Sequence, residues 1–404
     1  MSSLRSNPLR FFLITASLGY FTLGFTNIIT GSVLPLLETS FQVTHAASGL
    51  VLSFSAMGFF LASFLVIFLE GKIGYSRVIF SGAALFFSAL ALLLFARNFT
   101  WLLLAKTTMS FGGGLVETGI AVGVSQQSAR RAGRVLNYSQ ALFAAGCILS
   151  PIVVSLFVSK STSVLEAGNT TWQSPFFVAM GVSLLFLLFT LPLLLRGKAA
   201  IHESRGRGIG DAMTTFQNPL FWLTGVVIFL YVGAEVGASS WITSYVFETK
   251  NIPLAFASLF PSLLWVGLFV GRLLTGWLVE KWAYTTTLFF LITLALASSL
   301  LLFFARTPFW STTAVLLLGF GFSGTFPTVQ GILIHSIQPG NVFALSLFSA
   351  LASAGAFAAN LLIGKIGDLS GLSAAFVVIL LFIFFQLLLT FGIQHALKTR
   401  HHSR

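Results

Sequence analysis

Four charged residues stand inside long apolar stretches of this chain, namely Lys106, Glu117, Glu235 and Arg272. A charge within a bilayer is costly, so it is retained only where it lines a cavity or has a partner. Burial favours the protonated form of a carboxyl, and a carboxyl that alternates between wet and dry surroundings binds and releases a proton. We therefore predict that Glu117 and Glu235 couple the protein to protons. The alternative for both is a structural carboxyl that only stabilises helix packing.

Glu235 has polar neighbours at helical spacing. Tyr231 lies one turn before it and Ser239 one turn after it, which gives a polar stripe on one helix face. Sugar sites combine hydrogen-bonding side chains with aromatic rings, so this stripe suits a sugar or another polyol. The other candidates for solute binding are polar or aromatic residues in other apolar stretches: Asn27, Asn137, Gln140, Trp265, Gln330 and Asn360.

The two basic residues favour other roles. Lys106 precedes Glu117 by eleven residues, about 16 Å along a helix, which excludes an ion pair between them. We expect Lys106 to extend its amine to the interface between membrane and water on the outer side. For Arg272 we expect a gate or a helix clamp near the cytoplasmic side rather than contact with the solute.

Composition excludes several classes of protein. The 404 residues are 56% hydrophobic and 8% charged, against roughly 25% charged in a soluble domain. A single cysteine, Cys147, rules out an internal disulfide framework and a thiolate metal site. The sequence contains no nucleophile–base arrangement, no metal-ligand spacing and no phosphate-binding loop. We therefore expect neither an enzyme nor a bound metal or other cofactor.

The apolar stretches predict twelve membrane-spanning helices, because a span needs about 20 mostly apolar residues and every backbone group must be bonded internally. The expected spans are 11–32, 47–69, 76–96, 101–124, 135–158, 175–195, 219–246, 254–279, 285–305, 310–334, 342–364 and 373–396.

Basic residues indicate the orientation. With the N-terminus inside, fifteen Lys or Arg fall in cytoplasmic segments and five on the opposite side, so the positive-inside rule places both termini in the cytoplasm. The net charge of +12 then faces anionic membrane lipids, and not a nucleic acid. Short loops and compact tails favour a bacterial inner membrane.

The two halves of the chain resemble each other at a constant offset of 209 residues. This shift superimposes Gly24 on Gly233, Gly58 on Gly267, Lys72 on Lys281, Phe111-Gly112 on Phe320-Gly321 and Gly146 on Gly355. We expect an N-terminal six-helix bundle over 1–195, a cytoplasmic linker over 196–218 and a C-terminal six-helix bundle over 219–404.

The duplicated plan resembles the major facilitator superfamily. Residues 276–281 (GWLVEK) follow that superfamily's loop motif of glycine, acid and base, whereas residues 72–77 (KIGYSR) keep only its tail, with Gly71 where the acid normally stands. The resemblance implies an all-α membrane protein of twelve helices in two pseudo-symmetric bundles that rock about a site between them. It also implies that Glu280 and Lys281 take part in gating.

Two helices are similar to those of the fucose/galactose/glucose:proton symporter family. Residues 112–118 (GGGLVET) resemble its glycine-rich fourth helix, and residues 231–235 (YVGAE) resemble its seventh. One departure stands in the first helix, where Gly31 occupies the place of an aspartate, four residues before Pro35. A mechanism that needs that aspartate does not carry over, and Glu235 is the candidate to replace it.

The resemblance implies a secondary active transporter that moves a small polar solute, a monosaccharide by preference, by alternating access with proton coupling. Proton-antiport efflux of lipophilic compounds is the alternative, because the chain contains 45 phenylalanines. A receptor that binds a solute without transport is a further alternative. The superfamily implies a functional monomer.

Overall fold

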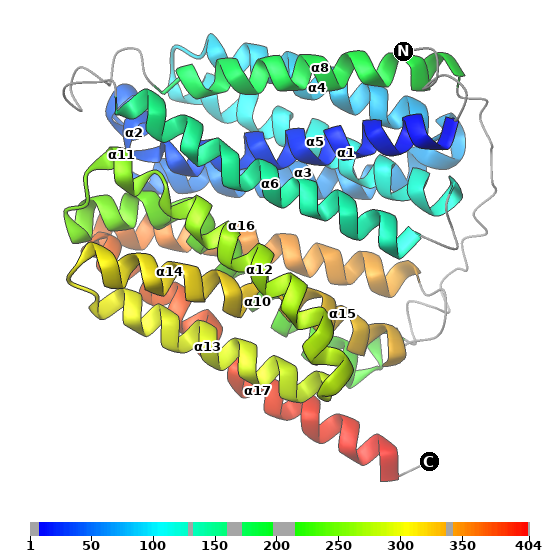
Figure 1. The fold of residues 1–404 in the computed structure, drawn as a ribbon, viewed down its shortest axis with the longest axis vertical. Coiled ribbons are helices and arrows are strands. Elements are labelled where there is room, and N and C mark those ends of the chain that lie inside the picture. The colour runs from blue at the N-terminus through cyan, green and yellow to red at the C-terminus, as the bar shows by residue number, and fades with distance from the viewer. Residues whose placement is uncertain (1–7, 128–131, 160–171, 197–214, 337–341, 403–404) are drawn as a thin grey trace. The chain divides into compact units, whose positions relative to one another are not determined.

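The computed structural model describes residues 8–127, 132–159, 172–196, 215–336 and 342–402, and they form helices joined by short connections (Figure 1). Among these residues, eleven helices are long and apolar enough to cross a membrane. The remaining long helix, α5 (Phe99–Gln127), has 29 residues, about 43 Å at the usual rise per residue. It contains Lys106 and Glu117, which lower its hydropathy, so it corresponds to the fourth expected span.

The chain divides into two compact units, the first comprising residues 1–43 and 54–204. Its helices are α1 (Pro8–Ser32), α2 (Leu34–Phe41), most of α3 (His45–Ile73), α4 (Tyr75–Leu94), α5, α6 (Ala132–Val158) and α8 (Ser174–Arg196). In this unit α1 packs along α6, and α4 packs along α5 and α8.

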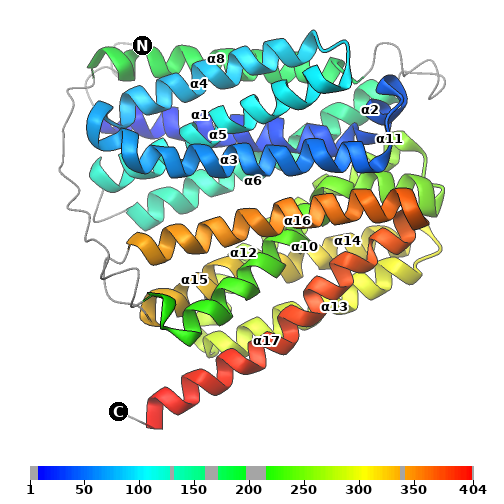
Figure 2. The ribbon, with the colours of Figure 1, turned by 180° about the vertical axis from the view of Figure 1, so that it is seen from behind.

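The second unit comprises residues 44–53 and 205–404. Its helices are α10 (Pro219–Lys250), α11 (Leu254–Ala257), α12 (Phe260–Lys281), α13 (Tyr284–Phe304), α14 (Pro308–Phe322), α15 (Thr325–Ser336), α16 (Val342–Ala375) and α17 (Val377–His402). Here α10 runs along α16, as Figure 2 shows, and α14 packs on α12 and α13. Most of the expected linker, 196–218, lies outside the described residues.

Close helix contacts repeat from one unit to the other. A Cβ atom on Gly58 would collide with the carbonyl of Thr107, and a Cβ atom on Gly267 would collide with the carbonyl of Leu316. The shift of 209 residues superimposes Gly58 on Gly267 and Thr107 on Leu316. The sequence repeat therefore records a repeat of packing, since small residues let two membrane helices approach closely.

Residues 44–53, at the start of α3, pack within the second unit. The Ser53 hydroxyl donates a hydrogen bond of 2.8 Å to the carbonyl of Phe357. The backbone N–H of Ala46 donates one of 3.1 Å to the Asp368 carboxylate. Both partners belong to α16, so α3 contributes its first turns to one unit and its remainder to the other.

The tenth expected span differs from the prediction of one helix over 310–334. The structure ends α14 at Phe322 and begins α15 at Thr325 (Figure 1). Ser323 and Gly324 form the break, and the Ser323 and Thr275 hydroxyls lie 3.2 Å apart in a hydrogen bond. A Cβ atom on Gly324 would also collide with the Thr275 side chain. The break thus lies pressed against α12, a contact that hydropathy does not reveal.

The glycine contacts predict opposite effects for two alanine substitutions. Gly267→Ala places a methyl group against backbone, and overpacking of this kind costs about 1–3 kcal/mol. Gly181→Ala in α8 meets nothing within 4 Å, so it should gain up to about 1 kcal/mol from the better helix propensity of alanine. Thermal unfolding in detergent should show a lower midpoint for Gly267→Ala only. Equal midpoints for the two variants would contradict the packing.

Candidate functional site

The predicted polar stripe of α10 lies inside the second unit. Asn218 caps the start of this helix by accepting a hydrogen bond of 3.1 Å from the N–H of Leu220. Further along the helix, Tyr231 is fully buried, Ser239 is 6% exposed and Glu235 is half-buried. The three residues share a face because they are four residues apart. Glu235 therefore retains some access while its neighbours on that face are enclosed.

Helix α12 meets this stripe at two levels. The Trp265 indole N–H donates a hydrogen bond of 3.0 Å to the Ser239 hydroxyl. Arg272 acts electrostatically on both Glu235 and Tyr231. Because Trp265 precedes Arg272 while Ser239 follows Tyr231, the two helices run antiparallel at this contact. On α10 the two levels are marked by Tyr231 and Ser239, which are eight residues apart, about 12 Å along the helix axis.

A third helix reaches the same stripe through its backbone. The Tyr231 hydroxyl donates a hydrogen bond of 2.8 Å to the carbonyl of Phe322, the last residue of α14. Terminal carbonyls of a helix lack an intrahelical partner, so Tyr231 satisfies one that the break exposes. The Tyr231 ring also lies edge-on to the Phe322 ring, with centroids 6.0 Å apart. Sequence reasoning did not find this contact, although Gly324 and Pro327 signal an interrupted helix.

Asn360 joins α10 from another side. Its amide oxygen accepts a hydrogen bond of 3.0 Å from the Trp241 indole N–H, and both side chains are buried. Trp241 stands two residues after Ser239 and therefore lies on a different face of the helix. Asn360 thus belongs to the contact between α10 and α16, apart from the stripe of Tyr231, Glu235 and Ser239.

Glu117 lies in the first unit, on α5, where it is half-buried. Its neighbours Gly113 and Ile120 contact Leu23 and Gly19 of α1. The buried phenol of Tyr20, also on α1, lies within the electrostatic reach of Glu117. Glu117 therefore lies on the part of α5 that faces α1, a proximity that the separation of these residues in the sequence concealed.

The remaining predicted residues have different surroundings. Asn27 is exposed within α1, and Gln330 is half-buried on α15. Lys281 is exposed at the end of α12. The side chains of Asn137, Gln140 and Glu280 lie outside the described part of the structure.

The expectation for Lys106 is wrong. Its side chain is 2% exposed, and its Nζ atom has no hydrogen-bond partner among the described residues. The neighbouring Ala105 and Met109 of α5 are buried as well, so this part of the helix is enclosed and the amine does not reach an interface. An amine without a partner in an apolar interior is unfavourable.

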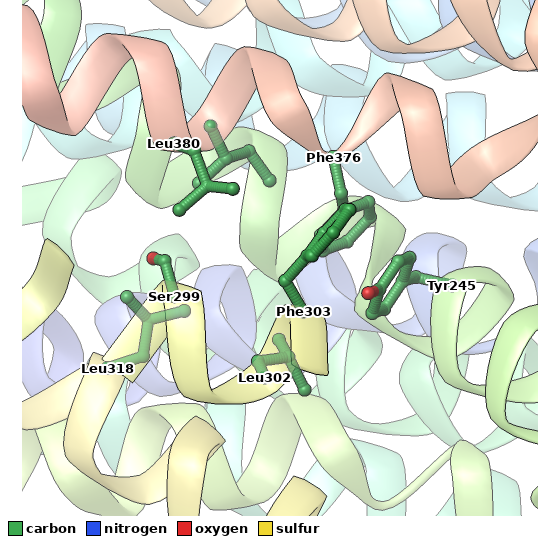
Figure 3. A pocket seen from close by; sticks show the side chains of 8 residues that line it. Tyr245, Ser299, Leu302, Phe303, Leu318, Phe376 and Leu380 are labelled. Carbon is green, nitrogen blue, oxygen red and sulfur yellow. The ribbon is translucent and has the colours of Figure 1, made fainter. Parts of the chain in front are cut away.

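The pocket in Figure 3 lies elsewhere in the second unit. Its lining is mostly apolar and comes from α10, α13, α14, the start of α17 and the residue before α17: Tyr245, Ser299, Leu302, Phe303, Leu318, Phe376, Ile379 and Leu380. The Tyr245 and Phe376 rings stack in it with centroids 3.8 Å apart. None of the residues predicted to bind solute lines this pocket, and its surface offers too few polar groups for a sugar.

Two lysine substitutions should change stability in opposite directions. Lys106→Met removes a buried amine without a partner and should stabilise the protein by about 1–3 kcal/mol. Lys250→Met removes a hydrogen bond of 2.8 Å to the Phe303 carbonyl and a cation–π contact with Tyr245, so it should destabilise by about 1 kcal/mol. Unfolding midpoints in detergent measure both effects. A lower midpoint for Lys106→Met would show that the amine has a partner.

Comparison with known proteins supports the architecture. A family model described as Major Facilitator Superfamily matches residues 16–342. The glucose/mannose transporter GlcP of Bacillus subtilis is 23% identical over 362 residues, with 85% of each chain covered. The L-fucose-proton symporter of Escherichia coli is 24% identical over 296 residues, covering 65% of this chain and 66% of that protein.

A solved structure agrees with these matches. The nucleoside transporter NupG superimposes with a TM-score of 0.75 at 16% sequence identity, covering 95% of this chain and 99% of that one. The predicted all-α membrane fold is therefore confirmed. Because the family model spans most of the sequence, the chain belongs to the major facilitator superfamily and is an integral membrane transport protein, not an enzyme.

Proposed function

We propose that this protein transports a small polar solute, a monosaccharide by preference, together with protons by alternating access. The observation that carries the proposal is the group formed on α10 and α12 by Tyr231, Glu235, Ser239 and Trp265. Helix α10 supplies a half-buried carboxyl and two hydroxyls, and α12 supplies an indole ring that is hydrogen-bonded to the Ser239 hydroxyl.

These chemical groups match a sugar. Hydroxyls of a sugar both donate and accept hydrogen bonds, and the Ser239 oxygen accepts from Trp265 while its own proton is available to a ligand. The hydrogen bond also fixes the indole, whose face can cover the apolar side of a sugar ring. We also include the amides of Asn27, Asn137, Gln140, Gln330 and Asn360 in the proposed path.

Glu117 of the first unit and Glu235 of the second both lie within apolar helices. Glu117 and Glu235 are half-buried, so both lie where a change in solvent access alters the cost of their charge. Uptake of a proton from one side of the membrane and release to the other would then drive the solute. The names of the two relatives, a glucose/mannose transporter and an L-fucose-proton symporter, favour the same solute class, and the second name also favours proton coupling.

The surroundings of the protein follow from the charge distribution. We propose a bacterial plasma membrane, with both termini in the cytoplasm and the basic segments on anionic lipids. We also propose a functional monomer of two six-helix domains, 1–195 and 219–404, joined by a cytoplasmic linker. Arg272, Glu280 and Lys281 are the proposed gating residues on the cytoplasmic side.

Replacement of Glu117 tests proton coupling. Glu117→Gln removes the titratable group but keeps its size, so proteoliposomes should lose accumulation of the solute driven by a proton gradient. Exchange of labelled for unlabelled solute should continue, because exchange needs no net proton movement. Glu117→Asp keeps the carboxyl and should retain part of the accumulation. If Glu117→Gln still concentrates solute against a gradient, Glu117 is not the coupling residue.

A thermal-shift screen tests the solute class. A monosaccharide at about a hundred times its dissociation constant should stabilise the protein by about 2.7 kcal/mol, and Trp265→Ala should abolish the shift. Trp310→Ala serves as the matched control, since Trp310 is 50% exposed at the start of α14 and should leave the shift intact. Stabilisation by lipophilic cations and by no sugar would favour efflux of lipophilic compounds instead.

A further inference from the structure

The first turns of α3, residues 45–53, lie directly against the backbone of α16. A Cβ atom on Gly49 would come within 2.7 Å of the Asn360 carbonyl oxygen, and one on Gly364 would come within 2.5 Å of the His45 carbonyl oxygen. Helices approach this closely only where glycine presents no side chain. The contact leaves α3 little room to slide along α16, so it fixes the position of His45.

His45, the first residue of α3, meets the far end of α10. Its Nε2 atom lies 3.4 Å from a carboxylate oxygen of Glu248, which is an ion pair when the imidazole is protonated. The imidazole also lies roughly perpendicular to the Trp241 ring, with centroids 6.1 Å apart. The His45 side chain is 19% exposed and that of Glu248 is 35% exposed. Protons of the surrounding medium can therefore reach the pair.

A second attachment of the same turn involves no imidazole. The Asp368 carboxylate of α16 accepts a hydrogen bond of 3.1 Å from the N–H of Ala46. The N–H groups in the first turn of a helix lack an intrahelical partner, and the helix dipole favours a negative charge beside them. This bond should hold the start of α3 whether or not His45 carries a proton.

The ion pair depends on pH in one direction. Histidine is the side chain that ordinarily changes its charge between pH 5 and 8, and only the protonated imidazole is attracted to a carboxylate. The attraction is therefore present in acidic surroundings and is lost as the pH rises. A partly exposed ion pair changes an equilibrium by up to about fivefold, so it adjusts an attachment that the backbone contacts already provide.

We propose that His45 and Glu248 form a pH-operated latch, which holds the first turns of α3 to α10 more firmly in acidic surroundings. The inference goes beyond the proposed function, because it concerns neither the solute nor the coupling proton. It uses only the proposed orientation, in which this end of α10 faces the medium outside the cytoplasm. Because α3 continues after Ser53 into the first unit, the latch acts on a helix that both units share.

Four other charged residues stand at this end of α10 and α16 or on the preceding helix α2: Lys250, Lys365, Asp368 and Glu38. The two lysines are cations and cannot replace the carboxylate partner of an imidazole. Asp368 is engaged with the backbone of Ala46. Glu38, seven residues before His45 in the sequence, is the acid that an experiment must separate from Glu248.

Amide hydrogen exchange in the purified full-length protein tests the latch without solute or a gradient. The measured segment is 45–53, at about pH 5.5 and about pH 8, near the two limits of the ordinary histidine range, after correction for the intrinsic effect of pH on exchange. In the unsubstituted protein, exchange should be about threefold slower at the acidic pH, as expected of a partly exposed ion pair. Residues 288–295 of α13 serve as an internal reference and should show no such difference.

Substitutions identify the two partners. Glu248→Gln keeps the size of the side chain and removes its charge, so exchange of the segment should be equally fast at both pH values. His45→Gln should have the same effect, and the double variant should add nothing, because both changes break one pair. His395→Gln on α17 is the matched control and should retain the full pH dependence.

Two further variants separate the latch from the other acids. Asp368→Asn removes the charge beside the first turn of α3, so exchange should be faster at both pH values while their ratio is unchanged. Glu38→Gln leaves Glu248 in place and should keep most of the pH dependence.

A pH dependence that is absent from the unsubstituted protein, or that persists undiminished in Glu248→Gln, would overturn the proposal. Loss of the dependence in Glu38→Gln but not in Glu248→Gln would overturn it as well. If His45→Gln unfolds the protein, Glu248→Gln decides the outcome alone. The proposed function fails separately, because this exchange pattern requires neither sugar binding nor proton-coupled transport.

Discussion

The structure depends on one constraint, that a polar group within a bilayer must find its partner inside the protein. Hydrogen-bonding side chains and backbone groups cannot turn to water there, so each unsatisfied group is costly. In the second unit the indoles of Trp241 and Trp265 and the phenol of Tyr231 all have partners on neighbouring helices. These bonds hold α10 to α12, α14 and α16, and Glu235 stands on α10 between Tyr231 and Ser239.

The carboxyls differ from these satisfied groups because their charge changes. A neutral acid can donate a hydrogen bond inside the protein, whereas a carboxylate needs donors or water. Glu235 interacts electrostatically with Arg272, and Glu117 with Tyr20. Each unit thus contains an acid inside an apolar helix, where a change in solvent access alters the cost of its charge. A transporter can convert that difference into movement, since a proton alters which packing arrangement is more stable.

Much of the fold could be predicted because its signals are strong. Long apolar stretches indicate the membrane spans directly. The recurrence of Gly58 as Gly267 indicates close contacts between helices. The polar stripe of Tyr231, Glu235 and Ser239 could also be placed on one face from its spacing. Contacts between helices far apart in sequence could not be predicted, such as Tyr231 with Phe322 or Trp241 with Asn360. Hydropathy also failed for Lys106, because it measures the cost of a charge but not whether neighbouring helices enclose the side chain. It failed for the break at Ser323 as well, because the sequence stays apolar where α14 ends and α15 begins.

The most direct measurement of the account is proton movement during solute entry in the absence of any applied gradient. Proteoliposomes in a weakly buffered medium receive a monosaccharide that the protein binds, and an electrode records the external pH. If the two carboxyls carry protons with the solute, the external medium becomes more alkaline as the sugar enters, and the change follows the amount of sugar taken up. Entry of sugar with no change in external pH would contradict the account.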